Sequence, residues 1–512
     1  MDEKRGEIRD KGTFSDNIGH EFTVISLKDQ SRAKINMLVE NLSYSRKIWC
    51  DTKMPMKYNG KINIFRAYDI RGIYGVDLNE EIAFQIGEAY GKFLNENARI
   101  AVGRDIRESS QSILNSLING LKETGINVID VGIVPSPVLY FTVKNLGLDG
   151  GVMTTASHLP PDWNGFKICD KEGIVRSQEN GLNQLKNFYL SQNFTRSSPG
   201  NETQYLKAID DYVNYVKNLI SLDRNLKVTV DYGNSVTALV VPNLLRNLGL
   251  EPIEISKDLK PSNPDRESEP SDTSLSNLKR AVLRNKSNIG IAYDGDGDRV
   301  AFVDEHGNII WSGNTIIPIF ALNYLRNIKG GKVVYDVTCS SAIPDFIRSL
   351  GGEAIEIRVG SGYCAEEVKK LGALFGGQYS GHTSFPEMGY IDDAIFASMK
   401  MLEIISRGST LSVLASQIPK YSSTKLTNIN CNDDTKFSVV IEVARRAKTA
   451  GFNIVQLDGV KIYDKENGSW VLVRASNTTP LIRVNAEGKT IEEAIKMHNY
   501  GEMLVKEVIN ND

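Results

Sequence analysis

Short apolar runs alternate with amphipathic segments from Lys61 to about residue 418. The runs are rich in β-branched residues, as in RIAVGRD (99–105) and KVVYDVTCS (332–340), and apolar residues recur at helical spacing in the segments that follow them. This alternation is typical of α/β units built on parallel strands. We therefore predict an α/β fold with mixed, largely parallel sheets.

The same strand, helix, strand pattern occurs three times. RIAVGRD leads to GLKETGINVIDVG, KVTVDYGNS (227–235) leads to LLRNLGLEPIEI, and KVVYDVTCS leads to FIRSLGGEAIEI. Each helix is expected to end at a glycine, namely Gly125, Gly249 or Gly351, because glycine is the usual residue just past a helix. Three copies in order, with similar internal lengths, predict three related α/β domains.

The two ends of the chain depart from this repeat. The segment NGSWVLVRASNTTPLIRVNAEG (467–488) predicts two strands around a polar loop, and a helix beginning near Thr490 completes a smaller C-terminal α+β domain. Residues 1–59 are polar, charged and weakly periodic, so we expect a poorly ordered extension. The four predicted domains span residues 60–205, 206–308, 309–418 and 419–512.

Composition narrows the classes of partner. The formal net charge of -3 gives no electrostatic reason to expect nucleic acid or an acidic membrane surface, so a small molecule is the expected partner. The five cysteines form no CxxC pair and no metal-ligand spacing. We find neither an apolar run long enough to span a bilayer nor a signal peptide. We expect a cytoplasmic protein, either a monomer or a homodimer.

Ser157 stands out in the stretch GGVMTTASHLPPDWNGFK (150–167). It follows an apolar run that reads as a buried strand, and Pro160 and Pro161 prevent a regular helix after it, since proline has no amide hydrogen. The serine is therefore predicted on a tight, exposed loop, and a turn at Asn164-Gly165 would bring Lys167 back towards it. Helix capping is the alternative role for Ser157. A serine beside His158 and a lysine suits a nucleophile or a phosphate carrier.

A cluster of acids lies in IGIAYDGDGDRVAFVDEHG (289–307), between two apolar strands. Asp294, Asp296 and Asp298 alternate with glycines that let the backbone bend, so the three carboxylates can converge. Such carboxylates repel one another without a cation, and their oxygens suit Mg²⁺. A calcium-binding EF-hand is the competing interpretation, because Glu305 is twelfth from Asp294, but Arg299 occupies the position where that loop needs glycine.

Three further loops carry polar side chains that suit a phosphorylated ligand. Arginine pairs with phosphate through two hydrogen bonds, and amide, hydroxyl and imidazole groups bind sugar hydroxyls. An ordinary turn or polar hairpin is the alternative for each loop. The candidates are Arg66 and Arg71 in FRAYDIRG, Gln378, Ser380 and His382 in FGGQYSGHTSF, and Arg474, Ser476, Asn477, Thr478 and Arg483 in and after RASNTTP.

Each of these loops falls in a different predicted domain, so a central cleft where four domains meet would bring them together. The motifs TASH with PP and NGFK, DGDGDR, GGQYSGH and RASNTTP, in this order and spacing, resemble those of the α-D-phosphohexomutase family, most closely its phosphomannomutase/phosphoglucomutase branch. The resemblance covers nearly the whole chain from Ile64 onward.

The resemblance implies a mutase that interconverts hexose 1-phosphate and hexose 6-phosphate of mannose, glucose or both. It implies that Ser157 is a phosphoserine, that the three aspartates and Ser157 bind one Mg²⁺, and that a hexose 1,6-bisphosphate is the bound intermediate and the activator. It also implies that residues of the loop of Gln378 recognise the sugar and that the RASNTTP loop holds the non-reacting phosphate. We expect Arg299 and Lys167 to offset charge as the phosphoryl group moves. Lys167, Arg71 and His158 are candidates for proton transfer.

Two positions depart from the family pattern. Gln378 stands where the family carries glutamate, and Ser361, in RVGSGY, stands where a histidine is frequent. An amide can bind a hydroxyl but is not a carboxylate, and a serine hydroxyl does not carry protons near neutral pH as imidazole does. Phosphoglucosamine mutase therefore stays open as an alternative function, as does a sugar-phosphate-binding protein without turnover.

Overall fold

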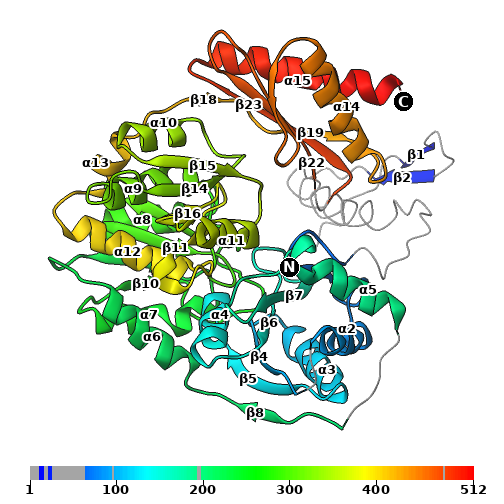
Figure 1. Ribbon diagram of the computed structural model, residues 1–512, viewed down its shortest axis with the longest axis vertical. Helices are drawn as coiled ribbons and strands as arrows, with labels where there is room; N and C mark the ends of the chain where they lie inside the picture. The colour runs from blue at the N-terminus through cyan, green and yellow to red at the C-terminus, as the bar shows by residue number, and fades with distance from the viewer. Residues whose placement is uncertain are drawn as a thin grey trace, which may run out of the picture. The chain divides into compact units, whose positions relative to one another are not determined.

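The computed structural model describes residues 64–94, 97–192, 198–476 and 479–511, together with strands β1 (Lys11–Ser15) and β2 (Glu21–Ile25), which pair antiparallel. The chain divides into two compact units, Met1–Gly60 and Lys61–Asp512. Most of the predicted extension 1–59 lies outside the described residues, so its disorder stays a prediction. The described residues of the second unit form four sheets, three in α/β blocks and one at the C-terminal end (Figure 1).

The first block has a six-stranded sheet in the order β3-β7-β6-β4-β5-β8. Strands β6, β4, β5 and β8 run parallel, whereas β7 and β3 add antiparallel pairings at one edge. Helices α2, α3 and α5 share a hydrophobic core with one face of the sheet, and α4 packs on the other face. The elements are β3 (Ile70–Ile73), α2 (Glu80–Phe93), β4 (Arg99–Arg104), α3 (Ser110–Glu123), β5 (Asn127–Ile133), α4 (Ser136–Asn145), β6 (Gly150–Thr154), β7 (Trp163–Asp170), α5 (Asn183–Ser191) and β8 (Glu202–Gln204).

The second block has a five-stranded sheet in the order β10-β9-β11-β12-β13. The first three strands of this order are parallel, and β11, β12 and β13 pair antiparallel. The elements are α6 (Ala208–Leu219), β9 (Val228–Asp231), α7 (Val241–Asn247), β10 (Ile253–Ile255), α8 (Ser276–Asn285), β11 (Ile289–Tyr293), β12 (Val300–Asp304) and β13 (Ile309–Ile310).

The third block has a four-stranded sheet in the order β15-β14-β16-β17, of which only the last pairing is antiparallel. Its elements are α9 (Gly313–Leu325), β14 (Lys332–Asp336), α10 (Ala342–Ser349), β15 (Glu353–Ile357), α11 (Ser361–Leu371), β16 (Phe375–Gly377), β17 (Thr383–Ser384), α12 (Ala394–Ser406) and α13 (Leu411–Ser416).

The repeated unit is the same in all three blocks. The helices α3, α7 and α10 are each followed by a glycine with a left-handed backbone, Gly125 (φ 82°), Gly249 (φ 79°) or Gly351 (φ 80°). The residue after each glycine donates its N–H back to a carbonyl of the last helical turn, at 2.9 to 3.2 Å. This arrangement satisfies carbonyls that the helix end leaves free. The predicted helix ends are therefore confirmed.

The C-terminal sheet is antiparallel and has the order β18-β23-β22-β21-β20, with β19 also paired to β23. Helices α14 and α15 lie along this sheet (Figure 1). The elements are β18 (Ser422–Ser423), β19 (Thr427–Asn430), α14 (Lys436–Thr449), β20 (Asn453–Val455), β21 (Val460–Tyr463), β22 (Trp470–Ala475), β23 (Leu481–Gly488) and α15 (Ile491–Asn511).

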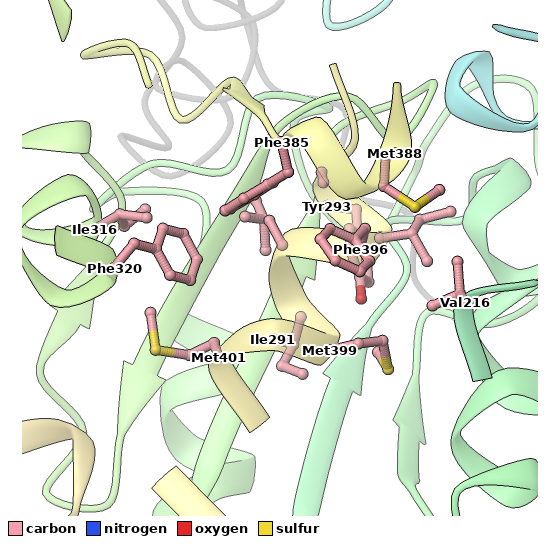
Figure 2. Close-up of a cluster of buried hydrophobic side chains, with 14 of the residues drawn as sticks. Val216, Ile291, Tyr293, Ile316, Phe320, Phe385, Met388, Phe396, Met399 and Met401 are labelled. Carbon is pink, nitrogen blue, oxygen red and sulfur yellow. The ribbon is translucent and has the colours of Figure 1, made fainter. Parts of the chain in front are cut away.

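One continuous core joins the three α/β blocks. Every residue of α12 is buried, and its Phe396, Met399 and Met401 lie among side chains of α6, α9 and β11 (Figure 2). The rings of Phe385 and Phe320 meet edge to face with centroids 5.2 Å apart. Helix α12 therefore fastens the third block to the second, and the loops of these blocks are held in a fixed relation.

The predicted fold class, three related α/β domains followed by a smaller α+β domain, is confirmed. No helix among the described residues combines the length and the apolar character that crossing a bilayer requires.

Candidate active site

A cavity of about 390 Å³ in the second unit is lined by loops of all three α/β blocks and of the C-terminal sheet. Its volume lies in the range of small-molecule sites. The structure brings these predicted site residues together in its lining: Arg66, Arg71, His158, Lys167, Arg299, Gln378, Ser380, His382, Arg474, Ser476 and Arg483. Asp298 and Ser361 line it as well. Asn477 and Thr478 lie outside the described residues.

Ser157 is the third residue after the buried strand β6 and has a left-handed backbone conformation (φ 54°) that is uncommon for serine. Its amide donates to Thr155 Oγ1 (2.9 Å), and its Oγ donates to Asp294 Oδ2 (2.8 Å). His158 Nδ1 is 3.3 Å from the same hydroxyl. The hydroxyl is thus held between the first aspartate of DGDGDR and an imidazole.

Two predictions about this stretch are wrong. Ser157 is predicted to be exposed but is buried, with 1 % of its surface accessible, because the loop of Gly295 in the second block packs against its carbonyl group. Asn164 and Gly165 lie within strand β7 and form no turn. The Asn164 side chain donates to Ser109 and Ser110 Oγ, and a Cβ at position 165 would lie 1.9 Å from the carbonyl oxygen of Ile70. Close approach of β3, rather than a turn, explains the glycine.

The three aspartates converge in the hairpin between β11 and β12, and their carboxylate oxygens lie within 4.8 Å of one another. Asp294 Oδ1 accepts from the amides of Gly297, Asp298 and Arg299, each at 3.1 Å, so this carboxylate shapes the loop. Glu305 contacts Ser412 in the third block. The side chain that an EF-hand would use therefore has another partner.

The chemistry of this cluster fits a divalent cation. All three aspartates are buried, and the Oδ1 atoms of Asp296 and Asp298 have no hydrogen-bond partner among the described residues. Burial and the neighbouring Asp298 and Asp296 raise the pKa of Asp294 well above its usual value. Unpartnered, mutually repelling oxygens are the donor set that a hard cation such as Mg²⁺ uses. The cluster can hold a metal ion.

The ammonium group of Lys167 forms ion pairs with two of the three aspartates. Its Nζ donates to Asp296 Oδ2 at 2.7 Å and also to Asp298 Oδ2. Burial alone would lower the pKa of Lys167, but the two carboxylates outweigh it and raise that pKa well above its usual value. The same contacts hold the pKa of Asp298 below its usual range despite burial. Lys167 lies in strand β7 instead of following a turn, and it lines the same cavity as His158.

Arg299 contacts His382 directly and is linked to His158 through Glu269, a residue that the sequence analysis missed. Its Nη1 donates to both oxygens of Glu269 at 2.7 Å, and its Nε donates to His382 Nε2 at 3.0 Å. Glu269 Oε2 is also 3.5 Å from His158 Nε2. Burial, followed by the positive charges of Arg299, Arg71 and Lys167, lowers the pKa of His158 well below its usual value.

The loop that is predicted to recognise the sugar joins β16 to β17 in the third block. The Gln378 side chain is buried and its Nε2 has no hydrogen-bond partner among the described residues, so an amide N–H is available to a ligand acceptor. Burial lowers the pKa of His382 to about 3. The second missed residue, Asp392, lies 3.4 Å from His382 Nδ1, and burial raises its pKa to about 7. Ser361, at the start of α11, faces the same cavity.

Arginines collect where the C-terminal sheet reaches the cavity. Arg474 Nε donates to Asp458 Oδ2 at 2.8 Å, and burial together with Arg474 lowers the pKa of Arg483. Arg71, which lines the same cavity, pairs with Asp69 at 2.6 Å. The Nε of Arg483 has no hydrogen-bond partner among the described residues. Such guanidinium groups suit a phosphate.

A larger cavity, of about 520 Å³, lies between the third block and the C-terminal sheet, but none of the predicted site residues lines it. Its buried cation, Lys461, is already paired with Glu356 at 2.8 Å. The smaller cavity, which the predicted site residues line, is therefore the candidate active site.

Comparison with known proteins finds a matching family model for each of the three α/β blocks and for the C-terminal domain. Models of phosphoglucomutase/phosphomannomutase α/β/α domains I, II and III match residues 63–195, 204–307 and 312–421, and the model of the C-terminal domain matches 426–498. A probable phosphoglucosamine mutase of Thermococcus kodakarensis is 35 % identical over 456 residues, which cover 87 % of this chain and 99 % of the relative. A phosphomannomutase/phosphoglucomutase of Pseudomonas syringae is 36 % identical over 437 residues, 84 % of this chain and 92 % of the relative.

A solved structure shows the same architecture. The crystal structure of a phosphoglucomutase/phosphomannomutase family protein from Burkholderia thailandensis aligns with a TM-score of 0.79 and 29 % identity, over 87 % of this chain and 97 % of that one. Four matched domains in the family order, and relatives aligned over nearly their full lengths, lead to one conclusion. The chain belongs to the phosphoglucomutase/phosphomannomutase family of α-D-phosphohexomutases.

Proposed function

We propose that the protein is a phosphohexomutase that interconverts the 1-phosphate and 6-phosphate of mannose, glucose or both. The observation that carries the proposal is the position of Ser157 Oγ, 2.8 Å from Asp294 Oδ2, beside a cavity lined by loops of all three α/β blocks and the C-terminal sheet. Full-length relatives with mutase names support it.

In the proposed cycle, phosphorylated Ser157 donates to the free hydroxyl of the sugar phosphate. The bond between phosphorus and Ser157 Oγ breaks, a bond to the sugar oxygen forms, and the hydroxyl proton leaves to a side chain of the site. A hexose 1,6-bisphosphate results, reorients, and returns its other phosphoryl group to Ser157. Added bisphosphate would serve as activator by loading the free serine.

Each group of residues has a role in this cycle. Asp294, Asp296, Asp298 and Ser157 would hold one Mg²⁺, which when bound supplies positive charge to the phosphoryl oxygens. Lys167 and Arg299 offset further charge and orient the phosphoryl group. His158, Lys167 and Arg71 are the candidates for proton transfer. Gln378, Ser380 and His382 bind sugar hydroxyls. The non-reacting phosphate is held by Arg66, Arg474, Ser476, Asn477, Thr478 and Arg483.

Phosphoglucosamine mutase activity is the second candidate, because relatives with that name align over 98 to 99 % of their length. The test is turnover of mannose 1-phosphate, glucose 1-phosphate and glucosamine 1-phosphate, each with Mg²⁺ and a trace of glucose 1,6-bisphosphate. We expect wild type to convert mannose 1-phosphate and glucose 1-phosphate and Ser157→Ala to convert neither. The control Ser349→Ala, which changes an exposed serine, should behave as wild type does. Conversion of the amino sugar alone would support the second candidate. Binding without conversion of any sugar would contradict both and indicate a sugar-phosphate-binding protein.

A further inference from the structure

We propose that Arg107 is a positioning residue that holds the Ser157 loop in the geometry needed for phosphoryl transfer. The inference rests on the function proposed above for Ser157. Arg107 follows strand β4 and is 6 % exposed. It does not line the active-site cavity, so it acts on the loop rather than on a substrate.

All five N–H donors of the Arg107 guanidinium are used. Nη2 donates to the carbonyls of Ser157 (2.8 Å) and Leu159 (2.7 Å), and Nη1 donates to those of Pro160 (2.5 Å) and Trp163 (3.0 Å). Nε donates to Asp105 Oδ2 at 3.1 Å. One planar side chain therefore binds four carbonyls between Ser157 and Trp163, which a lysine ammonium cannot do because it is a point charge with three donors.

The loop needs this support because its sequence forms no regular structure. Pro160 and Pro161 have no N–H to donate, so a helical turn cannot satisfy the preceding carbonyls. Ser157 also holds a left-handed backbone that persists only where surrounding contacts enforce it. Its carbonyl oxygen is fixed by Arg107 on one side and approached by Ser268 Oγ (3.5 Å) on the other.

Asp105 in turn orients the guanidinium. Its Oδ1 accepts from the Arg107 amide (3.0 Å) and from Ser110 Oγ, and its Oδ2 accepts from Arg107 Nε. The carboxylate is buried, and both of its oxygens accept hydrogen bonds. A chain of contacts thus runs from β4 through Asp105 and Arg107 to the Ser157 carbonyl.

The test compares Arg107→Lys, Arg107→Ala and Asp105→Asn with wild type and with the control Arg104→Lys, whose side chain contacts Asp105 O and not the loop. Single-turnover transfer from phosphorylated enzyme to glucose 1-phosphate is measured per phosphorylated site, so that a change in folded fraction does not enter. We expect Arg107→Lys to slow transfer about 10- to 100-fold, since a misplacement of about 1 Å costs that much, with KM changed less than about twofold. Guanidinium chloride far below denaturing concentrations should partly restore Arg107→Ala.

Transfer at the wild-type rate by Arg107→Lys would overturn the proposal, as would a rise in KM with an unchanged rate. If the Arg107 variants do not fold, Asp105→Asn tests the proposal instead, because this variant keeps the Arg107 guanidinium and loosens its orientation. A wild-type rate in that variant would overturn the proposal and a slower rate would support it. Failure of wild type itself to become phosphorylated would instead overturn the function proposed for Ser157.

Discussion

Replacing Lys167 with methionine removes the ammonium group that partners Asp296 and Asp298. Lys167 is 6 % exposed and the aspartates at most 3 %, so the remaining charges are not screened by water. Removing one partner of a buried ion pair costs about 3–5 kcal/mol, because the other partner stays buried without its counter-charge. In EDTA we therefore expect the melting temperature of Lys167→Met to fall by several degrees.

The same variant should bind Mg²⁺ more tightly than wild type does. Lys167 places a positive charge 2.7 Å from Asp296 Oδ2, where it repels an incoming cation. Removing that charge should lower the Kd for Mg²⁺ about tenfold or more, since 1.4 kcal/mol is tenfold in affinity. Mg²⁺ at about 100 times its Kd stabilises a protein by about 2.7 kcal/mol, so most of the lost stability should return.

The assay is thermal unfolding in EDTA and in a Mg²⁺ series, with Lys171→Met, an exposed lysine after the same strand, as control. The expected pattern is a larger gain from Mg²⁺ for Lys167→Met than for wild type or the control. Equal gains for all three proteins, or a Lys167→Met variant as stable as wild type in EDTA, would refute the electrostatic account of this cluster.

Two further variants test acidic side chains near the site. Burial raises the pKa of Asp393 to about 7, so the folded state holds a proton that the unfolded state releases near its ordinary pKa, and stability falls as pH rises from about 4 to about 7. The free energy of unfolding in urea should therefore rise for Asp393→Asn relative to wild type by up to about 1.4 kcal/mol per pH unit between about pH 4 and pH 7. Curves of unfolding free energy against pH that run parallel for the two proteins would contradict this. Glu269→Gln removes the carboxylate charge that pairs with Arg299 Nη1 at 2.7 Å, so the kcat/KM of this variant should fall about tenfold. The control Glu267→Gln should keep the kcat/KM of wild type. Equal kcat/KM values for the two variants would contradict the role of Glu269.

The repeated architecture could be predicted because its signals are local. Each helix end depends on a glycine within the same segment, as Gly125 shows, and the aspartate hairpin depends on six consecutive residues. Local signals failed at Asn164-Gly165, where pairing of β7 with β3 outweighed turn propensity. They failed again for the exposure of Ser157, because the loop of Gly295, which packs against its carbonyl group, comes from another block.

The missed site residues share a physical reason. Arg107 acts on carbonyls about 50 residues away in sequence, and Glu269 acts on side chains 30 and 111 positions away. Asp392 meets His382 only because β17 and the start of α12 fold together. Such roles exist only in the folded chain, whereas the acidic DGDGDR loop and the serine loop carry their chemistry within a few residues.

The central claim is that Ser157 carries the transferred phosphoryl group, and intact mass spectrometry tests it most directly. Wild type incubated with glucose 1,6-bisphosphate and Mg²⁺ should gain the mass of one phosphate, which tandem fragmentation assigns to Ser157 and glucose 1-phosphate removes. Ser157→Ala should gain nothing under the same conditions. A phosphate gain in Ser157→Ala equal to that of wild type, or an unmodified wild type that still interconverts sugar phosphates, would contradict the account.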